Sequence, residues 1–418
     1  MMCITSHTPW LSARVTLIIG IFFVCGTGVV SAQSGDPTGP TSGRIILIEP
    51  KKPRGALKVK QGKRVDSINA AEGMLVRRGY LLILSPTARA TVLCGDGKKR
   101  ELAPGPQGCP CTKPCTPEVC GIGYDGSTIG ATRGPDTEKG SFPVVISPRK
   151  TMLLNLRPTI RWAPIAGAKA STIYNVVLYG DGMRVIWTKE VASETRLAYP
   201  DKEPSLSPAE TYKVVITSDG MSSEQDQSPG LGFTTLTADQ ARVLADEVNK
   251  RKKLELPEPQ TRFLVSNLHA ARELYSEAID QLEDLFATMK EPAVAGMLGD
   301  LYTRIGLNRE AEKEYVVALS LTPAEDLDGR ALIEKDLAHV YENLGSFDQA
   351  LARLREAIKA YRRLRNRAMV KGFEARNRRL RAPVPASRHR QLALERRTRK
   401  RSRPPEPLAT FVTCRARS

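Results

Sequence analysis

One pattern of small and large residues between positions 298 and 358 constrains this 418-residue chain more than any other feature. Small side chains recur at helical spacing, and Tyr or Leu follows at positions that would lie beside them on a helix. Such a pattern predicts paired helices, because small residues let two helices approach and large residues fill the space next to them. The first copy comprises Leu298, Gly299, Tyr302, Gly306, Ala311, Tyr315, Ala318 and Pro323, and the second comprises Leu337, Ala338, Tyr341, Gly345, Ala350, Leu354 and Ala357.

The two copies resemble the hairpins of the tetratricopeptide repeat (TPR) family, which stack into a solenoid. They recur after 39 residues, where that family has about 34, and the excess fits an insertion at residues 324–328. A degenerate earlier copy can be placed on Val265, Ser266, Ala278 and Leu282, with His269 in place of the tyrosine. Thr237 and Gln240 form a capping-box pattern, which predicts a helix from there to about residue 252. Three hairpins suffice to bury a continuous core, so we expect helical repeats over residues 237–364.

The TPR resemblance implies a function class, since members of this family present a groove to a protein partner and perform no chemistry. The groove is the concave face formed by the first helix of each hairpin. The matching positions of this chain carry charges of both signs, which suits a peptide or another polar protein surface. They are Asn267, Asp300, Thr303, Arg304, Lys335, His339, Glu342 and Asn343. Recognition of an acidic tail is not expected, because Asp300 stands where that version of the groove has Asn.

Two β-rich segments precede the helices. In residues 44–122, short runs of β-forming residues alternate with turn residues, which predicts a small all-β unit. This order resembles the FecR-like domain of exported proteins. Residues 142–236 contain two strong β runs separated by a Gly-Asp-Gly hairpin signal at 180–182, which predicts a β-sandwich.

The sandwich segment resembles a fibronectin type III or immunoglobulin-like domain. That resemblance implies that Trp162 and Tyr212 are core residues, and Trp187 is also expected to fill the space between the sheets. The expected fold class is therefore multidomain, all-β followed by all-α. It comprises a small β unit, a β-sandwich and then a short TPR-like helical-hairpin solenoid.

The first 32 residues have the composition of a secretory signal. An apolar run ends in a small-residue cleavage site at residues 30–32. An uncleaved anchor helix is the alternative, because the apolar stretch continues past Cys25; a lipoprotein reading of Cys25 is weaker. Residues 33–43 are rich in Ser, Gly, Thr and Pro and are expected to form a linker. We therefore expect an exported protein, periplasmic or associated with the cell envelope.

Five of the eight cysteines cluster in the first β segment, at Cys94, Cys109, Cys111, Cys115 and Cys120. Disulfides are the favoured prediction, because an exported protein meets an oxidising compartment and no histidine lies nearby. A zinc site is the alternative, since Cys111 and Cys115 have a C-x3-C spacing. Five is an odd number, so one cysteine stays free or pairs elsewhere, for instance with Cys414.

Positive charge concentrates at the C-terminus. Nineteen Lys or Arg against three Glu follow Tyr361, a balance of +16 out of +18 for the whole chain. Residues 365–418 are therefore expected to form a basic disordered tail. Binding of a polyanion or an anionic membrane through this tail is the alternative function. Nucleic acid is not expected, because only Phe373 and Phe411 could stack on bases.

Catalytic signatures are missing from the sequence. It contains no phosphate-binding loop, HExxH motif, nucleophile elbow or dinucleotide-binding glycine pattern. None of the four histidines pairs with a nucleophile in any pattern that we recognise. The sequence therefore predicts a protein that is not an enzyme and that needs no cofactor, with a protein or peptide as its partner.

Overall fold

The computed structural model describes residues 39–50, 55–62, 66–123, 140–226, 228 and 230–381. The chain divides into two units, residues 1–32 and residues 33–418, and every described residue belongs to the second. The expected signal, the linker up to residue 38 and the chain beyond residue 381, including Cys414, lie outside the described residues. Within the ranges described, no helix is both long enough and apolar enough to cross a membrane.

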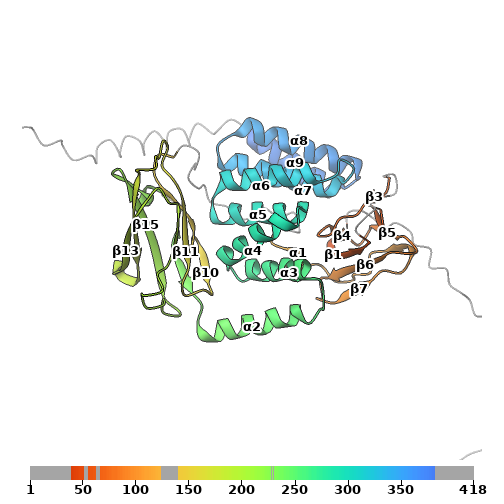
Figure 1. The fold of residues 1–418 in the computed structure, drawn as a ribbon. Helices are drawn as coiled ribbons and strands as arrows, with labels where there is room; N and C mark the ends of the chain where they lie inside the picture. The colour runs from red at the N-terminus through yellow and green to blue at the C-terminus, as the bar shows by residue number, and fades with distance from the viewer. Residues whose placement is uncertain are drawn as a thin grey trace, which may run out of the picture. The chain divides into compact units, whose positions relative to one another are not determined.

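Short strands build the first β unit, residues 41–122, as two four-stranded sheets (Figure 1). They are β1 (Thr41–Glu49), β2 (Leu57–Lys60), β3 (Ile68–Asn69), β4 (Leu75–Arg77), β5 (Leu81–Leu84), β6 (Arg89–Cys94), β7 (Lys99–Glu101) and β8 (Gly105–Gly108), followed by the single-turn helix α1 (Pro117–Cys120). One sheet has the order β4-β1-β6-β7 and the other β3-β2-β5-β8. Strand β1 begins within the expected linker, because Thr41 and Ser42 are buried and Thr41 pairs with Arg77.

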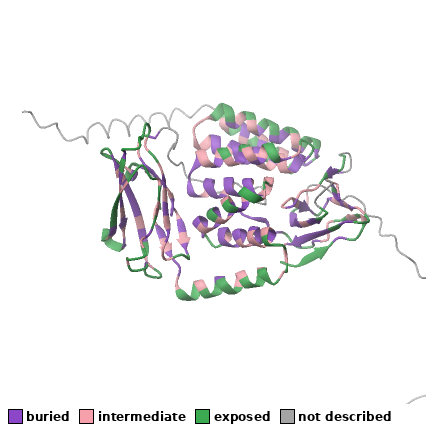
Figure 2. Ribbon diagram, in the orientation of Figure 1, coloured by how far each residue is buried: buried purple, intermediate pink, exposed green. Residues whose placement is uncertain are grey.

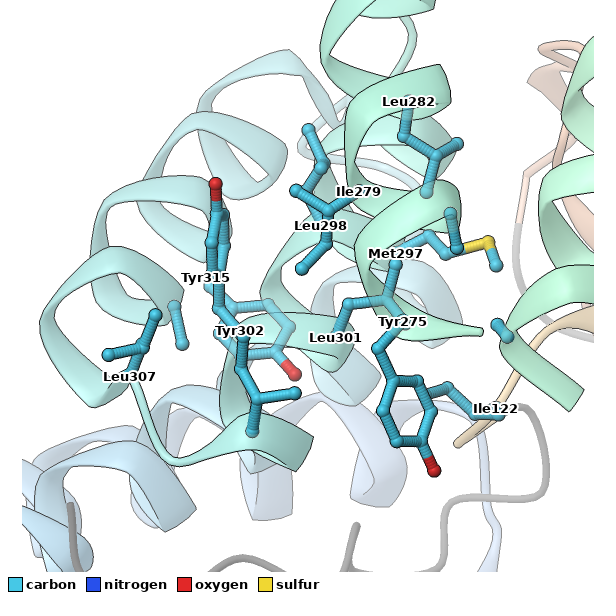
Figure 3. Packing of buried hydrophobic residues seen from close by; sticks show 14 of the residues in the cluster. Ile122, Tyr275, Ile279, Leu282, Met297, Leu298, Leu301, Tyr302, Leu307 and Tyr315 are labelled. Carbon is cyan, nitrogen blue, oxygen red and sulfur yellow. The ribbon is translucent and has the colours of Figure 1, made fainter. Parts of the chain in front are cut away.

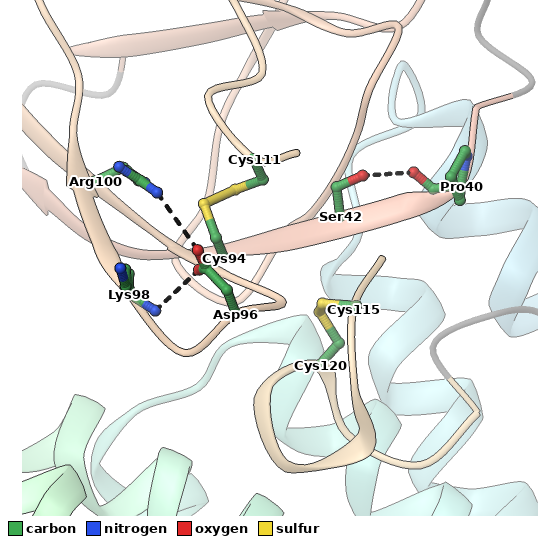
Figure 4. The surroundings of a disulfide bond; sticks show 9 residues. All are labelled: Pro40, Ser42, Cys94, Asp96, Lys98, Arg100, Cys111, Cys115 and Cys120. Atoms are coloured by element: carbon green, nitrogen blue, oxygen red, sulfur yellow. Dashed lines mark hydrogen bonds and ion pairs between the residues drawn. A yellow bond between two sulfur atoms is a disulfide. The ribbon is translucent and has the colours of Figure 1, made fainter. Parts of the chain in front are cut away.

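Two disulfides lie in the first β unit (Figure 4). Cys94 at the end of β6 bonds to Cys111, and Cys115 bonds to Cys120 in α1. Cys109 is the free cysteine of the part that the structure describes. The cysteines therefore lie where the disulfide prediction requires, with the odd one left over.

The second β segment forms two sheets. Its strands are β9 (Val144–Ser147), β10 (Thr151–Leu153), β11 (Thr159–Ala163), β12 (Ile173–Tyr179), β13 (Val185–Ala192), β14 (Arg196–Ala198), β15 (Thr211–Ser218), β16 (Met221–Ser222) and β17 (Phe233–Thr235). One sheet follows the path β10-β17-β15-β12-β13, with β16 paired to β15, and the other has the order β14-β11-β9. Trp162, Trp187 and Tyr212 are all buried in the cluster between them, as the sequence predicts. The predicted hairpin joins β12 to β13.

Buried polar contacts attach the sandwich to the helices that follow. Arg149 is 1% exposed, forms an ion pair with Asp226 at 2.6 Å and donates its Nε to the carbonyl oxygen of Ile305 at 2.8 Å. Arg161 pairs with Glu283 at 2.7 Å. The bond from Arg149 to Ile305 joins the sandwich to α5, and losing it would leave a buried guanidinium N–H without an acceptor.

Helix α2 (Ala238–Lys252) begins at the position that the sequence predicts. The Thr237 hydroxyl accepts a hydrogen bond from the Gln240 amide at 3.1 Å, and the Gln240 side chain accepts one from the Thr237 amide at 2.9 Å. This reciprocal capping box satisfies two amides that the first helical turn leaves without partners. Leu244 is the buried residue of this otherwise largely exposed helix (Figure 2).

A run of helices completes the described chain. It comprises α3 (Glu258–Ala271), α4 (Tyr275–Thr288), α5 (Pro292–Ile305), α6 (Asn308–Leu321), α7 (Leu327–Asn343), α8 (Phe347–Arg363) and α9 (Arg367–Arg381), and each packs against the next. The predicted turn residues Gly306 and Gly345 have φ angles of 84° and 76°, in the left-handed region that favours glycine. In the degenerate hairpin, Glu273 takes φ 62° at the corresponding turn.

The packing residues behave as the sequence predicts (Figure 3). Ala311 and Ala318 are completely buried, and Tyr315 lies in the core of α5 and α6. A Cβ atom on Gly299 would lie 2.7 Å from the Tyr315 ring, so the helices approach as closely as glycine permits. The β-then-α architecture and the hairpin array therefore match the expected fold class.

Helix α9 corrects the prediction of a disordered tail from residue 365. Phe373 is buried, and its ring lies 5.6 Å from that of Tyr361 on α8. Met369 and Leu380 pack against the same cluster. These apolar residues recur at helical spacing among the arginines, so the segment buries a stripe despite its high charge.

Candidate functional site

The first β unit and α1 lie against the first helix of each hairpin. We call the face of α3, α5 and α7 that meets them the inner face, defined by Gln260, Asn267, Ala293, Asp300 and Asp328. On α5 the approach is so close that a Cβ atom on Gly73 would lie 2.4 Å from the Cβ atom of Ala293. Gly73 has φ 85°, a second reason why only glycine suits this position.

Asp328, near the start of α7, is the centre of the most extensive contact. Its carboxylate accepts hydrogen bonds from Arg77 Nε at 2.8 Å, Arg77 Nη2 at 3.2 Å and the Tyr80 hydroxyl at 2.6 Å. Burial acts to lower the pKa of Arg77, but attraction and hydrogen bonding by Asp328 outweigh it and raise that pKa overall. Charge-assisted, bidentate hydrogen bonds of this kind are roughly twice as strong as those between neutral groups.

Further polar contacts secure the rest of the inner face. Gln61 donates to Asp326 at 2.6 Å, and the same Asp326 oxygen caps α7 by accepting the Gly329 amide at 3.0 Å. Burial raises the pKa of Asp326 to about 6. On α3, Gln260 donates to Glu72 at 2.7 Å. The bonds from Gln61 to Asp326 and from Gln260 to Glu72 join the β unit to residues far along the chain.

Arg44 on β1 borders a cavity between the β unit and the inner face. Its guanidinium donates to the carbonyl oxygens of Gly73 and Cys120 and lies 5.0 Å from the centre of the Phe263 ring. Burial lowers the pKa of Arg44 to about 10, an effect that the attraction of Asp300 partly opposes. Its Nε atom is buried and has no hydrogen-bond partner among the described residues.

The cavity has a volume of about 140 Å³ and is mostly apolar. Its apolar lining comes from the β unit and from α5 and α7: Met74, Leu75, Ile122, Met297, Leu332 and Ile333. Asp300 supplies a carboxylate that accepts the Tyr315 hydroxyl at 2.7 Å. Burial, and then repulsion by Asp336, raise the pKa of Asp300 well above its usual range. A largely apolar cavity bordered by one arginine and five Asp or Glu side chains can therefore recognise an apolar group that carries hydrogen-bonding atoms.

The structure brings three of the eight predicted partner-binding residues to this interface. Asn267 is completely buried and donates to the carbonyl oxygen of Val119 in α1 at 3.1 Å. Asp300 lines the cavity. Lys335 is 1% exposed and forms an ion pair with Asp336, another lining residue, at 2.8 Å. These side chains contact their own chain, so any contact with an outside partner stays a prediction.

The other predicted residues lie elsewhere. Glu342 accepts Arg376 Nε of α9 at 2.7 Å, and His339 Nδ1 lies 3.1 Å from Arg376 Nη2. Asn343 donates to the side chain of Asn308 at 3.1 Å. Thr303 is buried, and Arg304 is half-buried. Arg376 of α9 therefore contacts the C-terminal part of α7, while the β unit contacts its N-terminal end.

Sequence reasoning missed the residues that make the interface, above all Arg44, Gln61, Arg77, Asp326 and Asp328. One signal was present. The five-residue excess between the two repeats, residues 324–328, contains both aspartates that bind the β unit. A repeat insertion of five residues with three carboxylates is a signal for a contact outside the array.

His269 on α3 is a buried histidine of the described chain. Burial lowers the pKa of His269 to about 4, so this imidazole is neutral at pH 7. Within the described ranges, no group of three or more His, Cys, Asp or Glu side chains is placed to hold a metal ion.

Comparisons with known proteins add little to this description. No protein-family model and no curated protein matches the sequence. Among solved structures, the chain is similar to BtubC (BKLC) from P. vanneervenii, with 15% identity over 42% of this chain and 97% of that chain. The TM-score is 0.27, so this similarity carries no conclusion about fold or function.

Proposed function

We propose that this protein is a non-catalytic interaction protein whose helical array binds protein segments through its inner face. The observation that carries the proposal is the docking of the first β unit there, through buried bonds from Arg77 and Tyr80 to Asp328 and from Gln61 to Asp326. A helical face that already holds a protein segment by charge-assisted hydrogen bonds has the chemistry of protein recognition. Its own β unit is the first occupant, and an outside partner binds where that unit leaves space.

Finer assignments belong to the same proposal. We assign the hairpins of α3 to α8 to the TPR type, supported by the left-handed turns at Gly306 and Gly345. We assign the first β unit to the FecR-like type and the sandwich, with Trp162 and Tyr212 in its core, to the immunoglobulin or fibronectin type III class. The two disulfides support an oxidising compartment, and hence export with residues 1–32 as the signal.

The size of the cavity favours a protein partner over a cofactor. Sites for cofactors and drug-sized ligands measure about 300–1,000 Å³. This cavity measures about 140 Å³, close to the roughly 150 Å³ that accommodates a benzene-sized group. One apolar side chain of a partner fits this space. The Arg44 Nε atom, which has no partner within the described chain, then donates to a carbonyl oxygen of the bound segment.

The decisive experiment fills the cavity without disturbing the fold. Gly296 lies in α5 and lines the cavity, and a Cβ atom there would meet nothing within 4 Å. Gly296→Leu therefore places an apolar side chain in the cavity and gains up to about 1 kcal/mol of helix propensity. Gly372→Leu is the matched control, because Gly372 is also helical and open but lies in α9.

We expect the unsubstituted protein and Gly372→Leu to recover the same partner from a cell-envelope extract, and Gly296→Leu to lose it. A photo-crosslinking residue at position 296, but not at 372, should attach to a peptide of that partner. Equal recovery by both leucine variants, or crosslinks only within this chain, would overturn the proposed role of the cavity.

A further inference from the structure

The last two helices carry far more positive charge than they neutralise. Residues 347–381 contain twelve Lys or Arg and three Asp or Glu. Four of these cations form ion pairs: Arg353 with Glu334, Lys359 with Glu356, Arg362 with Glu374 and Arg376 with Glu342. The other eight are exposed and have no ion pair within the described part of the chain. Uncompensated charge at this density attracts anions over a distance of about one Debye length, roughly 8–10 Å.

A cleft of about 250 Å³ lies between α8 and α9 within this charged surface. Arg355 and Arg362 line it from α8, two helical turns apart, and Arg378 lines it from α9. The Arg362 side chain is bonded to Glu374 at 2.6 Å, but this pair is exposed and therefore weak. The three guanidinium groups thus face one space with a single carboxylate among them.

A polar side chain lines the cleft between the arginines. Asn377 is 9% exposed, and its side chain makes no hydrogen bond with a described residue. Its amide atoms are open to the cleft and are not among the buried polar atoms that lack a partner. The Asn377 amide is therefore available to bond a group that enters the cleft between the arginines.

We propose that the α8–α9 cleft binds the phosphate groups of a linear phosphate-bearing polymer. The planar guanidinium fork of arginine matches two oxygens of a phosphate, and Arg355 and Arg378 are free to supply it. Successive phosphates of a chain can occupy the cleft and the charged surface beside it. Each contact releases counterions, so binding weakens steeply as salt rises.

The structure disfavours two other kinds of anionic partner. A bilayer would need apolar residues to insert, but Met369, Phe373 and Leu380 of α9 pack inward against α8. A flat membrane surface also fits a cleft poorly. Recognition of nucleic-acid bases would need stacking residues, and Phe347 at the start of α8 is the exposed aromatic side chain on the two helices. Binding is therefore to phosphates alone.

The test uses the full chain and fluorescently labelled long-chain polyphosphate, with anisotropy as the readout. Arg355→Gln with Arg378→Gln should weaken binding about tenfold or more, because both lose their bidentate contacts. Arg367→Gln with Arg379→Gln removes the same net charge from exposed positions outside the cleft. This pair should weaken binding only about two- to threefold, because salt screens the attraction of an exposed charge that makes no direct contact. Equal weakening by both pairs would mean diffuse attraction and would overturn the site.

A chemical footprinting experiment distinguishes binding at the cleft from binding at the basic residues beyond position 381. Polyphosphate should protect Arg355 and Arg378 from modification by an arginine-specific dicarbonyl reagent, as read by peptide mass spectrometry. Protection confined to residues after 381 would overturn the proposal. So would binding to phosphatidylglycerol vesicles without binding to polyphosphate, which would make a membrane the partner.

Discussion

Replacing Asp328 by alanine should release the first β unit from the helical array. The Asp328 carboxylate accepts two hydrogen bonds from Arg77, at 2.8 and 3.2 Å, and one from the Tyr80 hydroxyl at 2.6 Å. Without it, the Arg77 guanidinium is buried with no counter-charge. Breaking a buried pair in this way costs about 3–5 kcal/mol, whereas an exposed pair contributes no more than about 1 kcal/mol.

Urea unfolding and amide hydrogen exchange measure this effect together. The matched control is Glu356→Ala, which removes the exposed partner of Lys359 at 3.6 Å on α8. We expect Asp328→Ala to lower the free energy of unfolding by several times more than the control does. Exchange should accelerate in strands β1 and β6, while β12 and β15 of the sandwich stay protected, because the lost contacts belong to the first β unit.

Equal shifts of the urea midpoint in Asp328→Ala and Glu356→Ala would refute this reasoning. Rescue provides a second check. Arg77→Leu and Asp328→Leu combined with Tyr80→Phe, which removes the hydroxyl that would lose its acceptor, should recover most of the loss. Apolar residues can replace a buried ion pair at little net cost. A triple variant as unstable as Asp328→Ala would show that the shape of the contact, and not the unpaired charge, dominates.

Three further predictions concern other parts of the chain. The pKa of Asp326 is about 6 in the folded state and about 3.9 in the unfolded state. The protonated Asp326 side chain therefore stabilises the fold below about pH 4, and this stabilisation is lost as the pH rises through 6. Asp326→Asn should remove this part of the pH dependence, up to about 3 kcal/mol between pH 4 and 7 in urea unfolding; identical profiles would contradict it. Cys111→Ser breaks a bridge that spans 17 residues and should cost about 3 kcal/mol. Cys109→Ser, at the free thiol, should cost less than about 1 kcal/mol in the same non-reducing assay. Thr237→Ala removes the cap of α2 and should cost about 1 kcal/mol, seen as faster exchange in the first turn of that helix; unchanged exchange would show that the cap is dispensable.

The helical hairpins could be predicted because their signal is local. Gly299 must be small and Tyr315 large because the two residues contact each other between neighbouring helices. Gly306 must adopt a left-handed turn between them. Such requirements involve residues less than twenty positions apart and recur with the helical period, so one sequence displays them.

The prediction of disorder from residue 365 failed at α9 because the deciding contact is tertiary and not local. Charge density dominates the composition from residue 365 onward and predicts disorder. Three apolar residues at helical spacing, Met369, Phe373 and Leu380, nevertheless bury a stripe against α8. Whether this segment is ordered depends on whether another helix offers a surface on which the stripe can pack. Composition carries no such information.

The sequence alone therefore determined that this chain is β-rich and then helical, that its hairpins close on small residues, and where α2 begins. Only the tertiary structure decided what occupies the inner face. Asp328 and Arg77 stand 251 positions apart, and nothing in the sequence distinguishes them from the many other aspartates and arginines. Polar pairing has no period and no fixed spacing, so it is specified by the fold that brings the groups together.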